Sequence, residues 1–364
     1  MLEQVVAAFD RQDYRTAAQL LKELLKQSPQ DPWVQFYVAR LQEVSGKASA
    51  AENIYRQLLR QSANPKLMAQ ARQGLQRLEE AEKERRQQAI AQATADESNQ
   101  EPGLLVLEAV AGENRNAIVQ RFAQIMKIDA YTARGLLPSR GWRLYRSGSI
   151  GELQVYGQEL LQAEIPAFWA SLSELQAIQV FRIHYFQAFA PTASVVCFND
   201  VNQSGLLSFN WSEVGQRVEG LLPIFGQVVD LGYRDRLEWK EHVEDYVHVC
   251  DLHLINRQCI LRLVDSQYDF HQGVSANVHH DTIRQYWNEL SAGLNQQLPE
   301  TPIQSLFTPF AETTEDFTVV LDRIASHIHL ARSTDCYLDT AFHLYSSLAF
   351  LQHSRAIAKK IGAL

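Results

Sequence analysis

The feature that most constrains the fold is an internal repeat: residues 1–64 repeat with a period of 34. Segment 13–17 aligns with segment 47–51, and Leu21 aligns with Tyr55. In each copy, apolar residues recur three and four positions apart, which is the spacing of one face of an α-helix. Each copy therefore predicts two amphipathic helices, and the copies must stack because one helical hairpin cannot bury its apolar face alone.

The two helices of each hairpin are predicted to approach closely. Ala17 and Ala51 are small residues at equivalent positions, and Gly46 supplies a turn residue that adopts positive φ freely. On these residues, segment 1–64 resembles the tetratricopeptide repeat (TPR), and a third, unpaired helix to about residue 86 is expected to cap the array. The resemblance implies a concave surface that holds a peptide or another protein.

Three residues of the second repeat are candidates for partner binding. Trp33, Phe36 and Arg40 lie on its first helix, which presents the binding face in the family that this segment resembles. The alternative is that Trp33 and Phe36 pack between repeats. Both interpretations remain open at this point.

The composition changes after residue 86. Residues 87–102, QQAIAQATADESNQEP, become small and polar, and the Pro102–Gly103 pair stops any helix. This segment is predicted to be a linker that follows a helical domain over residues 1–86.

Residues 103–175 are predicted to form a small α/β domain. The expected elements are a strand at 103–110, helices at 116–126 and 129–137, an extended segment at 142–146, a helix at 150–161 and a strand after 165. This order resembles the C-terminal domain of the bacterial ribosomal stalk protein over residues 103–170. The resemblance implies an exposed helical hairpin that recruits partner proteins.

Charge is distributed unevenly along the chain. Residues 114–150 hold seven basic side chains and one acidic one, whereas residues 151–364 hold 13 basic and 25 acidic ones. Arg134, Arg140 and Arg143 of this basic strip are candidates for binding an acidic partner, a phosphate backbone or an anionic membrane surface. The alternative is that the strip faces the acidic remainder of the same chain.

Aromatic residues within the basic strip suggest a second function. Tyr131, Trp142 and Tyr145 interleave with its arginines, as a protein that binds single-stranded nucleic acid requires. A regulator that binds nucleic acid through residues 114–150 is therefore the alternative function. The chain's net charge of −8 argues against it.

Residues 176–364 are predicted to form a strand-rich α+β domain that resembles no family we recognise. Strands are expected at 180–186, 193–198, 206–211, 246–254 and 259–264, and helices at 212–222, 280–298, 317–331 and 338–358. The fold class is therefore multidomain α+β, with N-terminal TPR-like hairpins, a small α/β middle domain and an antiparallel-sheet module with C-terminal helices.

Histidine and cysteine gather in one strand region without the spacing of a metal site. His248, Cys250, His253 and Cys259 lie within twelve positions, but alternation along a strand places His248 and Cys250 opposite His253. The two cysteines also lack the short spacing of structural zinc sites. We expect no metal and no cofactor.

Other catalytic signals are weak. Asp251 and Asp265 could pair across a hairpin, but strand-end aspartates are usually solvated. The sequence lacks glycine-rich phosphate loops and the common hydrolase motifs. We expect no enzyme, and an enzyme of unknown class in the strand-rich domain is the third alternative.

The leading interpretation is a non-catalytic adaptor, scaffold or complex-assembly factor that binds proteins through the TPR-like repeats. Four cysteines without a close pair fit a reducing compartment, and no stretch approaches the roughly 20 apolar residues of a membrane span. We expect a cytoplasmic protein, and a place at the periphery of a membrane-bound complex stays open.

Overall fold

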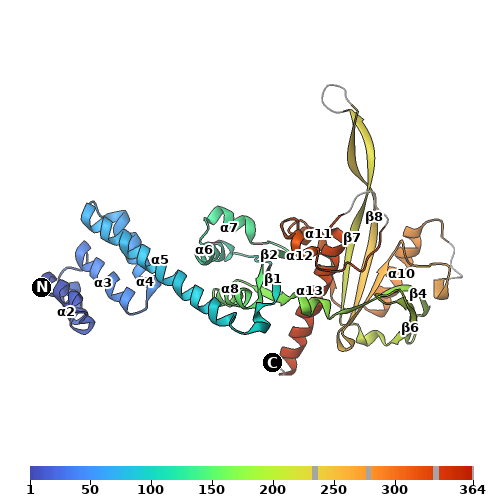
Figure 1. Cartoon of the computed structure of the whole chain (residues 1–364), viewed down its shortest axis with the longest axis horizontal. Helices are drawn as coiled ribbons and strands as arrows, with labels where there is room; N and C mark the ends of the chain where they lie inside the picture. Colours follow the sequence, from blue (N-terminus) through green and yellow to red (C-terminus); the bar gives the residue numbers. More distant parts are fainter. Residues whose placement is uncertain (232–236, 276–279, 331–335, 363–364) are drawn as a thin grey trace. The chain divides into compact units, whose positions relative to one another are not determined.

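The computed structural model describes residues 1–231, 237–275, 280–330 and 336–362. The chain divides into two compact units, Met1–Gln92 and Ala93–Leu364 (Figure 1). The first unit is helical, and the second contains both sheets and the C-terminal helices. The predicted α+β class, with helical repeats first and a sheet-rich region after them, is confirmed.

The first unit consists of two helical hairpins followed by a long helix. The helices are α1 (Leu2–Asp10), α2 (Tyr14–Gln27), α3 (Pro32–Val44), α4 (Ala48–Gln61) and α5 (Pro65–Ala93). Asp13 and Asp31 cap α2 and α3 by accepting backbone N–H groups, and the turn residues Gln12 and Gly46 adopt φ of 61° and 74°. Tyr55 is fully buried in the core between the helices.

The predicted end of the third helix is wrong. α5 continues to Ala93, seven residues past the predicted end, and a 3-10 helix η1 follows at Glu97–Gln100. Segment 87–102 is thus largely helical. The composition was misleading because alanine and glutamine, which dominate 87–93, are good helix formers even without an apolar face to bury.

The second unit begins with a three-stranded antiparallel sheet of order β2-β1-β3. Its strands are β1 (Pro102–Glu108), β2 (Trp142–Ser149) and β3 (Ala167–Ser171), and its helices are α6 (Arg115–Met126), α7 (Ala130–Leu136), α8 (Ile150–Gln162) and α9 (Leu172–Gln176). The order of elements is the predicted one. The resemblance to the ribosomal stalk domain stays a prediction.

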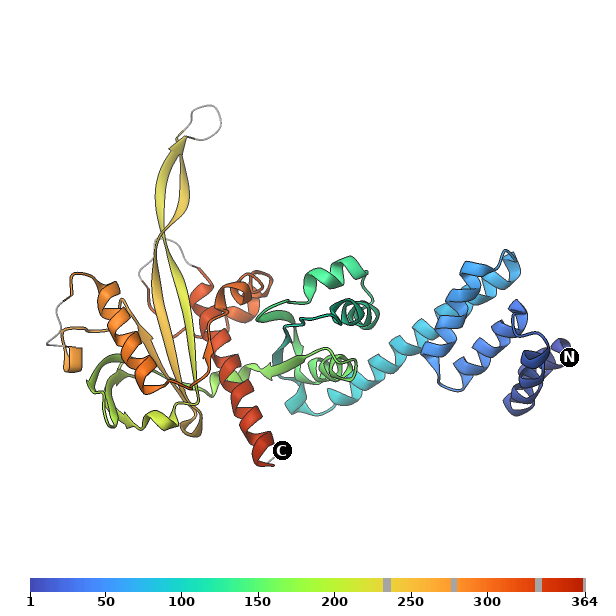
Figure 2. The ribbon, with the colours of Figure 1, turned by 180° about the vertical axis from the view of Figure 1, so that it is seen from behind.

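A seven-stranded sheet of order β10-β7-β8-β9-β4-β5-β6 follows. The strands are β4 (Gln179–Ala188), β5 (Ala193–Phe198), β6 (Ser204–Phe209), β7 (Gln216–Leu231), β8 (Leu237–Leu254), β9 (Cys259–Val264) and β10 (Ile303–Gln304). It is not purely antiparallel, because β4 pairs with β9 and β10 pairs with β7 in parallel. The long β7–β8 hairpin extends past its neighbours (Figure 2).

The predicted helix at 212–222 is wrong. Only Trp211–Glu213 forms a short 3-10 helix, and Gln216–Leu222 belongs to β7, paired with β8. Val218 and Leu222 fit both a helical and a strand pattern, and both side chains face one side of the sheet in the core. Pairing with β8 decides between the two patterns.

The C-terminal helices are α10 (Ile283–Gln297), α11 (Phe307–Ala311), α12 (Thr318–Leu321) and α13 (Leu338–Ile361). The predicted helix at 317–331 shrinks to α12, and the part at 331 lies outside the described residues. The two threonines before this segment do not cap it, because Thr313 Oγ1 accepts the Leu144 N–H and Thr314 Oγ1 donates to the Ala311 carbonyl.

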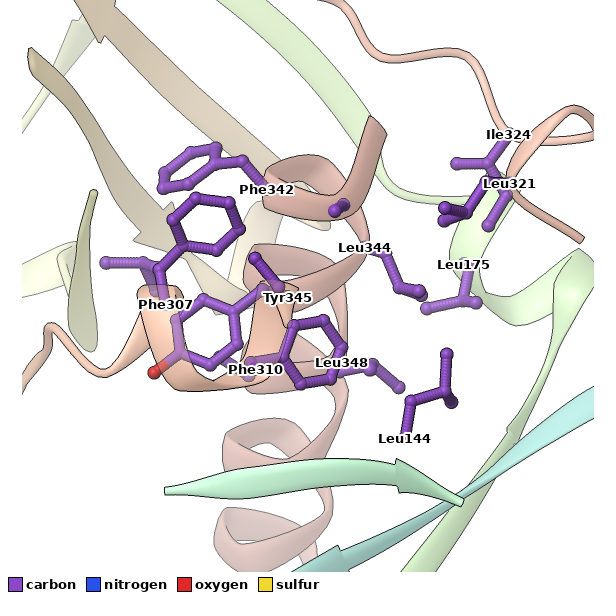
Figure 3. Packing of buried hydrophobic residues seen from close by; sticks show 14 of the residues in the cluster. Leu144, Leu175, Phe307, Phe310, Leu321, Ile324, Phe342, Leu344, Tyr345 and Leu348 are labelled. Atoms are coloured by element: carbon purple, nitrogen blue, oxygen red, sulfur yellow. The ribbon is translucent and has the colours of Figure 1, made fainter. Parts of the chain in front are cut away.

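One hydrophobic core joins the two sheets of the second unit. It contains Leu144 of the three-stranded sheet, Val218 of the seven-stranded sheet, and Tyr345 and Leu348 of α13, as Figure 3 shows for part of the cluster. The sequence-predicted domain boundary between residues 175 and 176 therefore falls inside a shared core. Among the described residues, no helix is both long and apolar enough to cross a bilayer.

Candidate protein-binding surfaces

The first helix of the second repeat, α3, presents a stripe of partly exposed side chains. Trp33, Arg40 and Val44 recur at helical spacing, so they share one face of α3. Trp33 and Arg40 are half-buried, and Val44 is 45% exposed. A partner could touch all three.

Phe36 is a core residue, which corrects its prediction as a partner contact. It is 4% exposed, and its ring lies 5.3 Å from that of Tyr37, 5.9 Å from that of Tyr55 and 6.0 Å from that of Trp33. The alternative interpretation, packing between repeats, holds for Phe36. Trp33 packs at the edge of this core, and part of its side chain remains exposed.

Arg40 has one unsatisfied donor on this face. Its guanidinium carbon lies 5.3 Å from the centroid of the Phe9 ring, a cation–π distance. Within the described residues, its Nε is buried and has no hydrogen-bond partner. A buried donor without an acceptor costs about 1–3 kcal/mol. Because Nε itself is enclosed, a partner would contact the exposed part of this half-buried side chain.

A polar network beside Arg40 joins successive repeats. Arg77 of α5 donates to both carboxylate oxygens of Glu43 at 2.8 and 3.0 Å, and the Tyr55 hydroxyl donates to Glu43 at 2.7 Å. Burial alone would raise the pKa of Glu43, but the hydrogen bonds from Arg77 and Tyr55 hold it below its ordinary value. Glu43 is thus kept charged, and its hydrogen-bond donors among the described residues are Arg77 and Tyr55, while Arg40 acts on it through its charge.

The sequence contained a signal for this network that our prediction missed. Glu43 and Arg77 are 34 residues apart, so they occupy equivalent positions in successive helical units. Gln70 of α5 is equivalent to Phe36 in the same way, and its buried Oε1 also lacks a partner among the described residues. The face thus holds one unpaired donor and one unpaired acceptor.

Comparison with known proteins agrees with this geometry. Residues 8–73 match the family model of the tetratricopeptide repeat, so the first unit contains TPR-type repeats. No curated protein and no solved structure matches the chain. The match begins near the end of α1, covers α2, α3 and α4, and ends in the first part of α5, so it includes Trp33 and Arg40.

Three of the seven basic side chains of the strip form contacts that stabilise the fold. Arg115 donates to the carbonyls of Val110, Leu137 and Pro138 at 2.5, 2.7 and 3.1 Å, which fixes the end of α7. Arg121 and Arg146 form ion pairs with glutamates of the same small domain at 2.5 and 3.1 Å.

The three predicted contact arginines lie in different settings. Arg134 is exposed on α7 and donates to Asn116 at 3.0 Å. Arg140 is exposed, and its guanidinium has no hydrogen bond or ion pair with any described residue. Arg143 is half-buried and donates to the carbonyl of Gly135 at 3.3 Å. Arg134 and Arg140 remain candidate contacts, and Arg143 is a weaker one.

The aromatic residues of the strip do not form a common platform. Trp142 is 8% exposed and packs against Tyr345 of α13, and Tyr145 packs against Phe122. Tyr131 is 89% exposed. Because two of the three rings are occupied inside the fold, the stacking surface expected for nucleic acid is not assembled.

His253 lies on the face of the sheet opposite His248 and Cys250, as strand alternation predicted, and the His248 ring lies 5.9 Å from that of Trp287 on α10. Cys250 and Cys259 belong to the core under α10, whereas His253 contacts Ser346 of α13 at 3.0 Å. Burial raises the pKa of Cys250 to about 12 and that of Cys259 to about 11, so both thiols stay protonated at neutral pH. They act as small hydrophobic residues.

Asp251 and Asp265 do not pair with each other, and the expectation that these strand-end aspartates are solvated is wrong, because both are buried. Asp251 is fully buried and accepts from Arg262 Nε and Nη2 at 2.8 and 2.7 Å, whereas Asp265 accepts the backbone N–H of His248 at 2.9 Å. The Ser346 hydroxyl also donates to Asp251, at 2.5 Å. This is a sealed polar network between sheet and helix, which no substrate can reach.

A cavity of about 430 Å³ lies beside α10. Phe189, Tyr286 and Leu290 give it apolar walls, and Glu289 is its acidic group. Glu289 lies 2.5 Å from His280 Nε2. The cavity's described lining residues include no serine, threonine or cysteine that could act as a covalent nucleophile.

Proposed function

We propose that this chain is a non-catalytic adaptor or assembly factor whose TPR-type repeats bind a segment of another protein. The observation that carries the proposal is Arg40, a half-buried cation on the candidate binding face with an unpaired Nε. The family match over residues 8–73 supports a protein partner. Repeats of this kind present extended surfaces on which peptides lie.

The chemistry of the face indicates the kind of segment that binds. Trp33 offers apolar area, and Arg40 offers a charged donor already desolvated by Phe9 and its surroundings. Tryptophan and arginine are the residues that most often dominate binding energy at protein interfaces. We therefore propose a partner segment with an apolar residue next to a carboxylate.

Nucleic acid binding by the basic strip is the weaker proposal. The strip has one exposed aromatic side chain, Tyr131, and Arg115, Arg121 and Arg146 are engaged in the fold. An enzyme is also weaker, because the cavity beside α10 lacks a described nucleophile and the buried network at Asp251 is closed.

The test compares capture of partners from a lysate of the source by the full-length chain and two charge-reversed variants. Arg40→Glu places a carboxylate on the binding face, and we expect it to abolish capture of the main partner. Arg60→Glu is the matched control, because Arg60 is exposed on α4, the second helix of the same hairpin. It should capture the partner as the unmodified chain does.

Thermal unfolding of each variant separates binding from folding. A partner captured equally by the unmodified chain and by Arg40→Glu would overturn the proposal. If neither variant captured the partner, the proposal would also be overturned, because binding would then depend on the overall charge of the chain and not on the α3 face.

A further inference from the structure

Two exposed apolar side chains of the second unit lie in oppositely charged surroundings. Tyr131 of α7 and Val319 of α12 have the largest exposed fractions, 89% and 77%, among the large apolar side chains of the described residues. Single exposed apolar residues are ordinary on protein surfaces. What distinguishes these two is the charge around each.

The surroundings of Tyr131 are positive. Tyr131 and Arg134 are three residues apart on α7 and share a face, and the exposed Arg140 follows. Asp129 is the single carboxylate of residues 114–150, and it caps α7 by accepting two backbone N–H groups at 2.9 Å. The Arg115 bonds to the carbonyls at the end of α7 keep this surface rigid.

The surroundings of Val319 are negative. Residues 312–322 contain no lysine or arginine and four carboxylates, and Arg323 follows. The carboxylates are those of Glu312, Glu315, Asp316 and Asp322. All four are exposed, and none forms a hydrogen bond or ion pair with the residues that the structure describes. Three of them lie three or four positions from Val319 along η5 (Glu315–Phe317) and α12.

Within the residues that the structure describes, no ion pair joins these two surfaces. The ion pairs of the basic strip are with Glu164 and Glu152, and Arg140 has no described partner. Glu152 and Glu164 belong to the acidic remainder of the chain, so the alternative in which the strip pairs with that remainder holds for Arg121 and Arg146. It does not hold for Arg140, and within the described residues neither Arg140 nor the four carboxylates around Val319 form an ion pair.

We propose that the α7 surface of one copy binds the 312–322 surface of a second copy of this chain. Tyr131 and Val319 supply the apolar centre, and the arginines and carboxylates around them supply complementary charge. Complementary charge at the rim of an apolar contact favours the correct orientation and speeds association. Both halves of the interface are present on one chain, so a second copy can complete it.

This inference is independent of the partner proposed for the repeats. Sedimentation velocity of the purified, nuclease-treated full-length chain tests it without any other protein. At about 0.1 M salt we expect a sedimentation coefficient that rises with protein concentration. At about 1 M salt the Debye length falls from about 10 Å to about 3 Å, and the rise should disappear.

Charge reversal identifies the surfaces. The double variants Arg134→Glu/Arg140→Glu and Glu315→Arg/Asp316→Arg should each sediment as monomers at low salt. An equimolar mixture of the two should associate again, because each variant then offers the charge that the other needs. The control Lys22→Glu/Lys26→Glu, on the exposed face of α2, carries the same change in net charge as Arg134→Glu/Arg140→Glu and should associate normally.

Three results would overturn the proposal. The unmodified chain stays monomeric at low salt, the charge-reversed variants associate as well as the control, or their mixture fails to associate. Binding of a single-stranded oligonucleotide that is lost in Arg134→Glu/Arg140→Glu, with no self-association of the unmodified chain, would assign the surface to nucleic acid instead.

Discussion

Replacement of Phe36 and of Trp33 by alanine should have opposite consequences, although both were candidates for the same surface. Phe36 is 4% exposed with three aromatic rings within about 6 Å, so Phe36→Ala leaves a cavity. Such truncations of a buried phenylalanine cost about 3–5 kcal/mol. The aromatic contacts place Phe36 toward the upper end of that range.

A loss of this size is large for a unit of this length. Domains are stable by about 5–15 kcal/mol, so Phe36→Ala removes a major part of the free energy of unfolding of the repeats. For domains of 60–100 residues, each 1 kcal/mol lowers Tm by about 4–8 °C. We therefore expect Tm of the repeat unit to fall by at least about 12 °C.

Hydrogen exchange of the full-length chain, followed by mass spectrometry, resolves the repeats from the second unit. In Phe36→Ala, peptides from residues 1–92 should lose protection while those from the two sheets keep it. Trp33→Ala should keep protection throughout and lose partner capture. If Phe36→Ala keeps full protection yet loses the partner, Phe36 is a contact residue and the packing argument fails.

Three further outcomes follow from buried groups. Gly74→Ala should lower Tm, because the added Cβ would lie 2.5 Å from the buried Tyr55 ring. This is expected although alanine is about 1 kcal/mol more favourable than glycine in a helix. An unchanged or higher Tm would contradict this packing. Asp251→Ala should lower the free energy of unfolding, measured by chemical denaturation, by about 3–5 kcal/mol, because it leaves the buried Arg262 charge unpaired. A decrease under about 1 kcal/mol would mean that the pair is solvated. Burial lowers the pKa of His253 to about 4, so as the pH falls the unfolded chain binds a proton at this histidine before the folded chain does. The free energy of unfolding should therefore fall by about 3 kcal/mol as the pH drops from about 6.5 to 4. His253→Gln should make the free energy of unfolding less dependent on pH over this range, and an equal slope in both proteins would refute this explanation.

Local patterns predicted most of the first unit. The 34-residue period, the small alanines and the turn at Gly46 are properties of neighbouring residues, and they specified the hairpins correctly. The burial of Phe36 was not predictable in the same way. A residue on the first helix of a repeat faces either a partner or the next helix, and the packing of the following helices decides which.

The second unit shows where sequence patterns reach their limit. Arg115 looked like part of a charged surface, but backbone carbonyls from Val110 and the end of α7 enclose its guanidinium. Asp251 was expected to be solvated, whereas the register of β8 and β9 places it opposite Arg262 in the core. Tertiary contacts of this kind leave no local signal in a single sequence.

Exposure of the candidate contacts was predicted only in part. Arg134 and Arg140 are exposed as expected, whereas Trp142 and Tyr145 are occupied inside the fold. Whether a basic segment is a surface depends on which carbonyls and carboxylates the fold brings near each arginine. The net charge of the segment does not contain that information.

The affinity of the captured partner for the full-length chain tests the central claim most directly. Titration of that partner with the unmodified chain, with Arg40→Glu and with Arg60→Glu gives three dissociation constants. A binding hot spot contributes about 2 kcal/mol or more, so Arg40→Glu should bind at least about 30-fold more weakly, with Arg60→Glu within about twofold of the unmodified chain. Equal affinity for the unmodified chain and Arg40→Glu would contradict the proposal that the α3 face binds the partner.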